Sequence, residues 1–125
     1  MTTRRILIVD DEDDIREVAQ VSLELVGQYE VLTASSGRDG LASARSERPD
    51  AILLDVMMPD MDGPATLAEL RADPVTADIP VVFLTAKTQS AERSRLAELG
   101  AAGILTKPFD PLKLASEVAA TLRWT

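Results

Sequence analysis

The sequence contains no cysteine and no histidine among its 125 residues. Disulfide bonds, thiolate metal sites, imidazole ligands and imidazole general bases are therefore excluded. Any metal ion bound by this chain must be held by oxygen atoms. Long hydrophobic segments are also missing: no apolar run could span a bilayer, and residues 1–5 lead directly into a short strand rather than a signal-peptide core. We expect a cytoplasmic protein with no membrane segment.

Positive charge is scarce. Lysine and arginine number 13 against 21 acidic residues, which gives a net charge of -8, and no basic cluster is present. Direct binding to nucleic acid is therefore not expected. The length and the 46% hydrophobic content predict one domain, residues 1–125, with its own core.

The sequence does contain short apolar runs that end in polar groups. Such uninterrupted runs, rich in β-branched residues, are typical of parallel strands that are covered on both faces. The runs and the residues that follow them are Ile6–Val9 before Asp10 and Asp11, Ile52–Leu54 before Asp55, Val81–Leu84 before Thr85, and Ile104–Thr106 before Lys107.

Helical periodicity fills the segments between these strands, so strands and helices alternate five times. One face of the first helix should hold Ile15, Val18, Ala19, Ser22, Leu25 and Val26, and the core-facing residues of the second should be Leu41, Ala42 and Ala44. We predict a first strand from Ile6, further strands over 29–34, 51–55, 80–85 and 103–106, and helices over 15–26, 36–48, 64–72, 90–99 and 111–122. This alternation predicts an α/β fold with five helices on both faces of a doubly wound, five-stranded parallel sheet. The flavodoxin-like strand order 2-1-3-4-5 fits five strands and places the first and third side by side.

Ligands bind beyond the carboxyl ends of strands in open α/β sheets. Three carboxylates (Asp10, Asp11 and Asp55), the hydroxyl of Thr85 and the ammonium of Lys107 should therefore converge at one edge. These groups indicate a site for a hard metal ion and a phosphoryl group.

Residues 10–14 are five consecutive acids, which repel one another at the end of a buried strand. We expect Asp13 or Asp14 to cap the following helix, because Asp14 and Glu17 resemble a capping box. Asp10 and Asp11 have no such structural explanation, which favours their role in the site.

Four motifs at these strand ends occur together and in order. They are Val9-Asp10-Asp11-Glu12, the segment Leu54–Gly63 around Asp55, Leu84-Thr85-Ala86 and Thr106-Lys107-Pro108-Phe109. With them the chain resembles, over nearly its whole length, the receiver domain of bacterial two-component response regulators, the CheY-like family.

The resemblance implies that Asp55 accepts a phosphoryl group from a phosphohistidine on a sensor histidine kinase or a histidine phosphotransfer protein. It also implies a Mg²⁺ ion held by Asp11, Asp55 and the backbone carbonyl of Met57, with Asp10 holding a metal-bound water. Magnesium prefers six oxygens and keeps several waters, so few protein ligands are needed.

Lys107 would, by the same resemblance, place its ammonium on the phosphoryl oxygens, and Thr85 would donate a hydrogen bond to one of them. The resemblance further implies a cis peptide bond between Lys107 and Pro108. Met57 and Lys87 would occupy positions that tune hydrolysis of the acyl phosphate. A bulky Met57 suggests a phosphoryl lifetime longer than in the fastest chemotaxis members.

Other residues near these motifs have structural interpretations. We predict a positive φ at Gly63 before the third helix. Met57, Met58 and Met61 are expected to pack in the loop rather than bind a soft metal, since no cysteine or histidine joins them. Phe109 is expected in the core.

The chain departs from the family at Ile104, where many members carry an aromatic residue that reports phosphorylation to the surface. The transmission of the switch is therefore open. Ala101-Ala102-Gly103 replaces the acidic residues found in members that dimerise through this region, so we expect a monomer. The sequence does not decide whether Trp124 anchors the last helix or is exposed.

Three functional hypotheses follow. The first is a stand-alone receiver, not an enzyme, in which phosphorylation of Asp55 switches binding to an unknown downstream protein or relays the phosphoryl group. The second is a magnesium-dependent aspartyl phosphatase, but Met57 stands where its general acid should be. The third is a receiver-like module that binds partners without phosphorylation.

Overall fold

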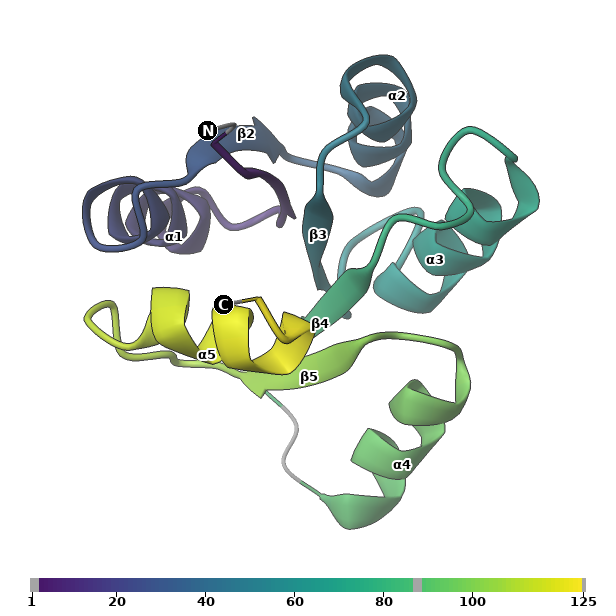
Figure 1. Ribbon diagram of the computed structural model, residues 1–125. Helices are drawn as coiled ribbons and strands as arrows, with labels where there is room; N and C mark the ends of the chain where they lie inside the picture. The colour runs from purple at the N-terminus through teal and green to yellow at the C-terminus, as the bar shows by residue number, and fades with distance from the viewer. Residues whose placement is uncertain (1–2, 87–88, 125) are drawn as a thin grey trace.

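The computed structural model describes residues 3–86 and 89–124, which form five strands and five helices (Figure 1). The strands are β1 (Arg5–Val9), β2 (Glu30–Ala34), β3 (Ala51–Asp55), β4 (Val81–Thr85) and β5 (Gly103–Thr106). The helices are α1 (Asp13–Leu25), α2 (Gly37–Glu47), α3 (Gly63–Ala72), α4 (Ser90–Glu98) and α5 (Leu114–Leu122). Every predicted element is present. The largest difference is at α5, which begins three residues later than predicted because residues 111–113 form a turn.

The strands form one parallel sheet in the order β2-β1-β3-β4-β5, as predicted. Val9, the last residue of β1, pairs with Leu54 of β3. Asp10 and Asp55 each follow one residue later along their chains, so the register itself brings these two side chains to the same edge of the sheet.

Each face of the sheet carries its own hydrophobic cluster. Helices α2, α3 and α4 cover one face, and α1 and α5 cover the other (Figure 1). Strand β1 contributes Leu7 and Val9 to the first cluster and Ile6 and Ile8 to the second. Because β1, β3 and β4 lie between two helical layers, their apolar residues are buried whichever way they point.

The buried face of α1 differs from the predicted one. Ala19 and Ser22 are buried as expected, but Val18, Leu25 and Val26 are exposed. Leu23 takes the core position instead. Helix α1 carries apolar residues on both faces, so its periodicity could not distinguish them. The exposed residues line a groove of about 390 Å³ that also includes Leu112, at the turn before α5.

The helix starts also correct the expected caps. Asp13 and Asp14 lie inside the first turn of α1, and Glu12 occupies the N-cap position without a side-chain hydrogen bond. The capping role predicted for Asp13 or Asp14 is therefore wrong, because α1 begins earlier than predicted. Their carboxylates still favour the helix by facing the positive end of its dipole. In α2 the smaller expectation that Ala42 faces the core is also wrong, since Ala42 is exposed.

Trp124 packs at the edge of the sheet opposite the carboxylates. Its ring meets that of Tyr29 edge-on, with centroids 5.6 Å apart, and the Arg4 guanidinium lies 4.3 Å from its centroid. Trp124 thus links the end of the chain to the segment that precedes β1. Among the described helices, none has the length and apolar character needed to cross a bilayer.

Candidate functional site

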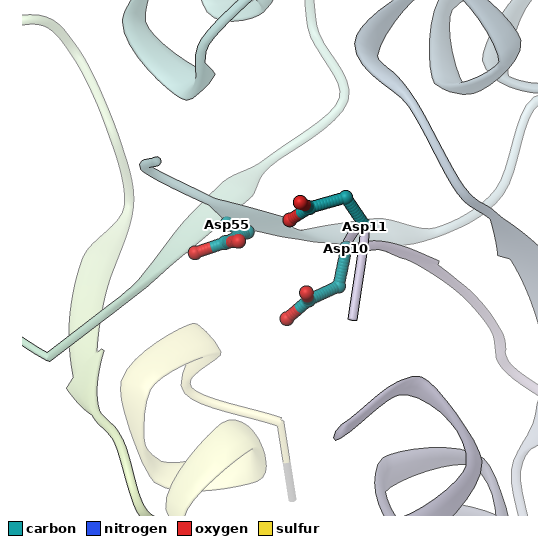
Figure 2. A group of neighbouring side chains, drawn as sticks. All are labelled: Asp10, Asp11 and Asp55. Carbon is teal, nitrogen blue, oxygen red and sulfur yellow. The ribbon is translucent and has the colours of Figure 1, made fainter. Parts of the chain in front are cut away.

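Asp10, Asp11 and Asp55 converge at the carboxyl ends of β1 and β3, as the strand order predicts. Each offers a carboxylate oxygen within 4.8 Å of the others. Figure 2 shows the three carboxylates gathered around a common space. Asp10 and Asp55 are buried, whereas Asp11 is exposed, so the cluster opens to solvent on the Asp11 side.

Asp10 is the most firmly held of the three carboxylates. Its backbone N–H donates to the carbonyl of Ala34 at 3.1 Å, and its Oδ1 accepts from the N–H of Glu12 at 2.9 Å. Its Oδ2 lies 2.8 Å from the Nζ atom of Lys107. A fully buried carboxylate is tolerated here because its oxygens have these partners.

Lys107 joins the two buried carboxylates. Its Nζ lies 3.1 Å from Oδ1 of Asp55, in addition to the Asp10 contact, and 3.6 Å from Oε1 of the exposed Glu12. The peptide bond between Lys107 and Pro108 is cis, as predicted. The N–H of Lys107 donates to the carbonyl of Thr85 at 2.8 Å, which ties the ends of β4 and β5 together.

Burial and the charges of the cluster shift two pKa values. Burial, followed by the charge of Asp10, raises the pKa of Asp55 to about 6, although Lys107 opposes the shift. Burial lowers the pKa of Lys107, but its hydrogen bond to Asp10 and the charge of Asp55 outweigh this effect, and the net shift is upward. Lys107 is therefore a fixed positive charge. The shared lysine leaves negative charge in excess, which favours a divalent cation.

Gly63 shapes the backbone that carries Asp55, but not in the way predicted. It has no positive φ; among the described glycines only Gly100 does, at +92°. Instead, a Cβ at Gly63 would lie 2.5 Å from the carbonyl oxygen of Asp55 and 2.8 Å from Cα of Val56. The first turn of α3 approaches the end of β3 so closely that only glycine fits.

The remaining predicted residues have mixed outcomes. Thr85 is buried at the end of β4, beside β3, which is the predicted edge. Met58 packs in the core and Met61 is partly buried, but Met57 is 65% exposed, so its expected packing is wrong. The ligand role of Met57 concerns its backbone carbonyl and stays a prediction. Lys87 lies outside the described residues.

Phe109 and Ile104, which the sequence singled out near Lys107, are both partly buried. Phe109 packs against the cluster formed with α1 and α5, in line with its expected core role. Ile104 packs against the opposite cluster, formed with α2, α3 and α4.

The sequence assigned no role in the site to two residues that lie there, although Glu12 belongs to the first motif. Glu12 reaches toward Lys107, and the guanidinium of Arg16 donates to the backbone carbonyl of Asp10 at 2.8 Å. For Arg16, the only signal in the sequence was its position one helical turn after Asp13. Periodicity cannot show that its side chain folds back over the end of β1.

The donor set fits a hard divalent cation. All three side chains offer carboxylate oxygens, the class of ligand that Mg²⁺ takes, and Asp11 provides access from solvent. The family model for the response regulator receiver domain matches residues 6–119. This chain belongs to that family.

Curated relatives of the receiver include named transcriptional regulators. The phosphate regulon transcriptional regulatory protein PhoB of Pseudomonas aeruginosa is 42% identical over 125 residues, which are 100% of this chain and 54% of that protein. The alkaline phosphatase synthesis transcriptional regulatory protein PhoP of Bacillus subtilis is 42% identical over 96% of this chain and 49% of its own length. The receiver thus spans about half the length of these relatives.

Among solved structures, the chemotaxis response regulator CheY4 of Vibrio cholerae superposes on the receiver with a TM-score of 0.88 at 35% identity. The match covers 96% of this chain and 99% of CheY4. A putative response regulator from Chloroflexus aurantiacus gives the same TM-score at 34% identity, over 98% of this chain and 99% of that one. The receiver is a signalling domain of two-component systems rather than a classical enzyme.

Proposed function

We propose that Asp55 of this receiver accepts a phosphoryl group, in the presence of Mg²⁺, from a phosphohistidine on a sensor histidine kinase or a histidine phosphotransfer protein. One observation carries the proposal: Asp55 is a buried carboxylate with the Lys107 ammonium 3.1 Å away and two further carboxylates within 4.8 Å. A carboxylate in this setting is a suitable nucleophile for covalent catalysis.

The chemical step needs little acid or base assistance. A carboxylate oxygen of Asp55 forms a bond to phosphorus while the bond between phosphorus and the histidine nitrogen breaks, and the nitrogen keeps that electron pair. Lys107, whose Nζ lies 3.1 Å from Oδ1 of Asp55, would balance the charge of the phosphoryl oxygens. The hydroxyl of Thr85 would donate to one of these oxygens.

Asp11, Asp55 and the carbonyl of Met57 would hold the Mg²⁺ ion, with Asp10 supporting it through water. When bound, the ion supplies positive charge that neutralises the carboxylates and the phosphoryl oxygens. Asp11 is the exposed member of the set and provides the entry side.

The proposal extends to what the phosphorylated receiver does. Phosphorylation changes the contacts of the receiver with an unknown downstream protein, or the receiver passes the phosphoryl group onward; we expect it to act as a monomer in the cytoplasm. This domain does not bind nucleic acid directly, since its net charge is -8.

Acetyl phosphate provides the test. The purified receiver is incubated with Mg²⁺ and acetyl phosphate, and the intact mass is measured. We expect one added phosphoryl group on the native chain and none on Asp55→Asn. Asp60→Asn is the matched control, because Asp60 is an exposed aspartate five residues further along. It should become phosphorylated like the native chain.

Two results would contradict the proposal. Equal phosphorylation of the native chain and Asp55→Asn would place the modification elsewhere. Absence of any modification, with Mg²⁺ and a folded protein, would favour the alternative of a receiver-like module that binds its partners without phosphorylation.

A further inference from the structure

Arg16 contacts the backbone of the site rather than its carboxylates. Its Nη1 donates to the carbonyl oxygen of Asp10 at 2.8 Å, and its Nη2 donates to Oδ1 of Asp13 at 2.6 Å. The side chain is only 20% exposed. The two nitrogens of one planar fork therefore hold the turn between β1 and α1 from one side.

The carbonyl of Asp10 lies just beyond the sheet. Strand β1 pairs with both neighbours as far as Val9, and the N–H of Asp10 still donates to Ala34. Among the described residues, the carbonyl of Asp10 has no partner in the ladder of the sheet and accepts from Arg16 instead. A carbonyl at this depth needs a donor, since an unpaired buried polar group costs about 1–3 kcal/mol.

This carbonyl belongs to the peptide unit that joins Asp10 to Asp11. Because a peptide unit is planar, fixing its oxygen also fixes the direction in which the chain enters Asp11. Asp10 has separate partners for its side chain in Glu12 and Lys107. For Asp11, the described part of the chain shows no side-chain hydrogen bond or ion pair, so its orientation depends on the backbone.

We propose that Arg16 is a positioning residue of the cation site. By holding the Asp10 carbonyl, it sets the peptide unit from which the carboxylates of Asp10 and Asp11 extend, and so raises the affinity for Mg²⁺. The inference rests on the proposed function, because it takes these carboxylates as the Mg²⁺ site.

Electrostatics alone predicts the opposite effect. Arg16 is a cation next to a cation site, so loss of its charge should tighten Mg²⁺ binding if charge were its only contribution. Loss of the hydrogen bond should weaken binding, since groups that orient metal ligands typically contribute about 10-fold or more to affinity. The sign of the change therefore separates positioning from charge.

The experiment is isothermal titration of the purified chain with MgCl₂, without any phosphodonor. We expect Arg16→Ala to raise the Kd for Mg²⁺ about 10-fold. Arg16→Lys keeps the positive charge but loses the planar pair of N–H donors. Its Kd for Mg²⁺ should lie between those of the native chain and Arg16→Ala. Arg38→Ala removes the same charge from an exposed site on α2 and should not raise the Kd. Asp13→Asn leaves the bond to the Asp10 carbonyl and should stay within about 2-fold of the native chain.

Amide NMR provides a second measurement. In Arg16→Ala the ¹⁵N–¹H signals of Asp11 and Glu12 should move without Mg²⁺, whereas those of α5 should stay in place. Thermal unfolding checks that each variant is folded. Should Arg16→Ala fail to fold, Arg16→Lys and Arg16→Gln carry the same comparison, and each should raise the Kd.

The outcomes separate this inference from the proposed function. Arg16 variants that bind Mg²⁺ as tightly as the native chain, or more tightly, would overturn the positioning role and leave the proposed function intact. A native chain that binds no Mg²⁺ would contradict the metal site of the proposed function, and the inference would fall with it.

Discussion

Asp55 shows how burial sets the chemistry of a single residue. Its pKa of about 6 in the folded chain exceeds the ordinary value of 3.8, mainly because burial disfavours its charge. The folded state therefore binds this proton more tightly than the unfolded state. The resulting stability is fully present below pH 3.8 and is lost as the pH rises through about 6.

We therefore predict that, in EDTA, Asp55 makes the protein less stable at pH 7 than at pH 5. A pKa shift of this size changes the free energy of unfolding by on the order of 1–3 kcal/mol. Urea unfolding at the two pH values measures the difference. Asp55→Asn should be more stable than the native chain at pH 7 and should lose this part of the pH dependence. Parallel pH profiles for the two proteins would contradict the prediction.

Gly63 provides a second prediction at this scale. A methyl group there would meet backbone atoms of Asp55 and Val56 that cannot move independently of β3. We expect Gly63→Ala to destabilise the fold by about 1–3 kcal/mol, measured by urea unfolding, and to slow phosphorylation by acetyl phosphate. Ala65→Gly in the same helix is the comparison, since Ala65 is exposed and should affect stability alone. An unchanged stability for Gly63→Ala would show that α3 can move away.

Some residues of the site could be predicted from the sequence and others could not. Asp10, Asp11, Asp55 and Lys107 were predicted because each ends or follows a strand, and strand ends share one edge. Arg16 was not predicted, because its contribution depends on a long side chain that folds back to a carbonyl.

At the scale of elements, α4 is the helix with the fewest buried residues among those described. Leu96 is its only buried residue among those described. The helix gains a polar link through Arg93, whose Nη1 donates to the hydroxyl of Thr106 on β5 at 2.9 Å. Thr106 pairs with Thr85 and precedes Lys107, so the link lies next to the site.

We predict that Thr106→Val destabilises the protein by about 1 kcal/mol and speeds amide hydrogen exchange in α4, because Arg93 loses its acceptor. Mass-spectrometric exchange measures the second effect. Arg95→Ala is the control: Arg95 forms an exposed ion pair with Glu92 in the same helix and should change stability by less than about 0.5 kcal/mol. Equal exchange in both variants would show that the Arg93 link does not hold α4.

Helix α1 shows the limit of prediction at this scale. The central strands were predicted accurately because both of their faces are buried, so that each appears in the sequence as a continuous apolar run. Helix α1 has apolar residues around much of its circumference, and only tertiary packing decides that Leu23 is buried while Leu25 is exposed. Alternation with helices predicted a parallel sheet, and the order of the strands was chosen as the common doubly wound order that fits five strands, in line with the family resemblance.

The whole molecule combines a net charge of -8 with a cluster of three acids at one edge. Binding of Mg²⁺ to the folded state alone should therefore stabilise it. At ten times the Kd we expect about 1.4 kcal/mol, which raises Tm by several degrees. Calorimetry in MgCl₂, against NaCl of equal ionic strength with EDTA, measures the shift. Asp11→Asn should lose most of it. The same Tm in both buffers would argue against the site.

The position of Trp124 has a practical consequence for spectroscopy. It is the only tryptophan, and it stacks on Arg4 before β1, whereas the acidic cluster lies past the other end of that strand. Five residues of extended chain span roughly 16 Å. Intrinsic fluorescence will therefore follow global denaturation, and ion titrations will need an introduced fluorophore near the loop after β3 or a label-free method.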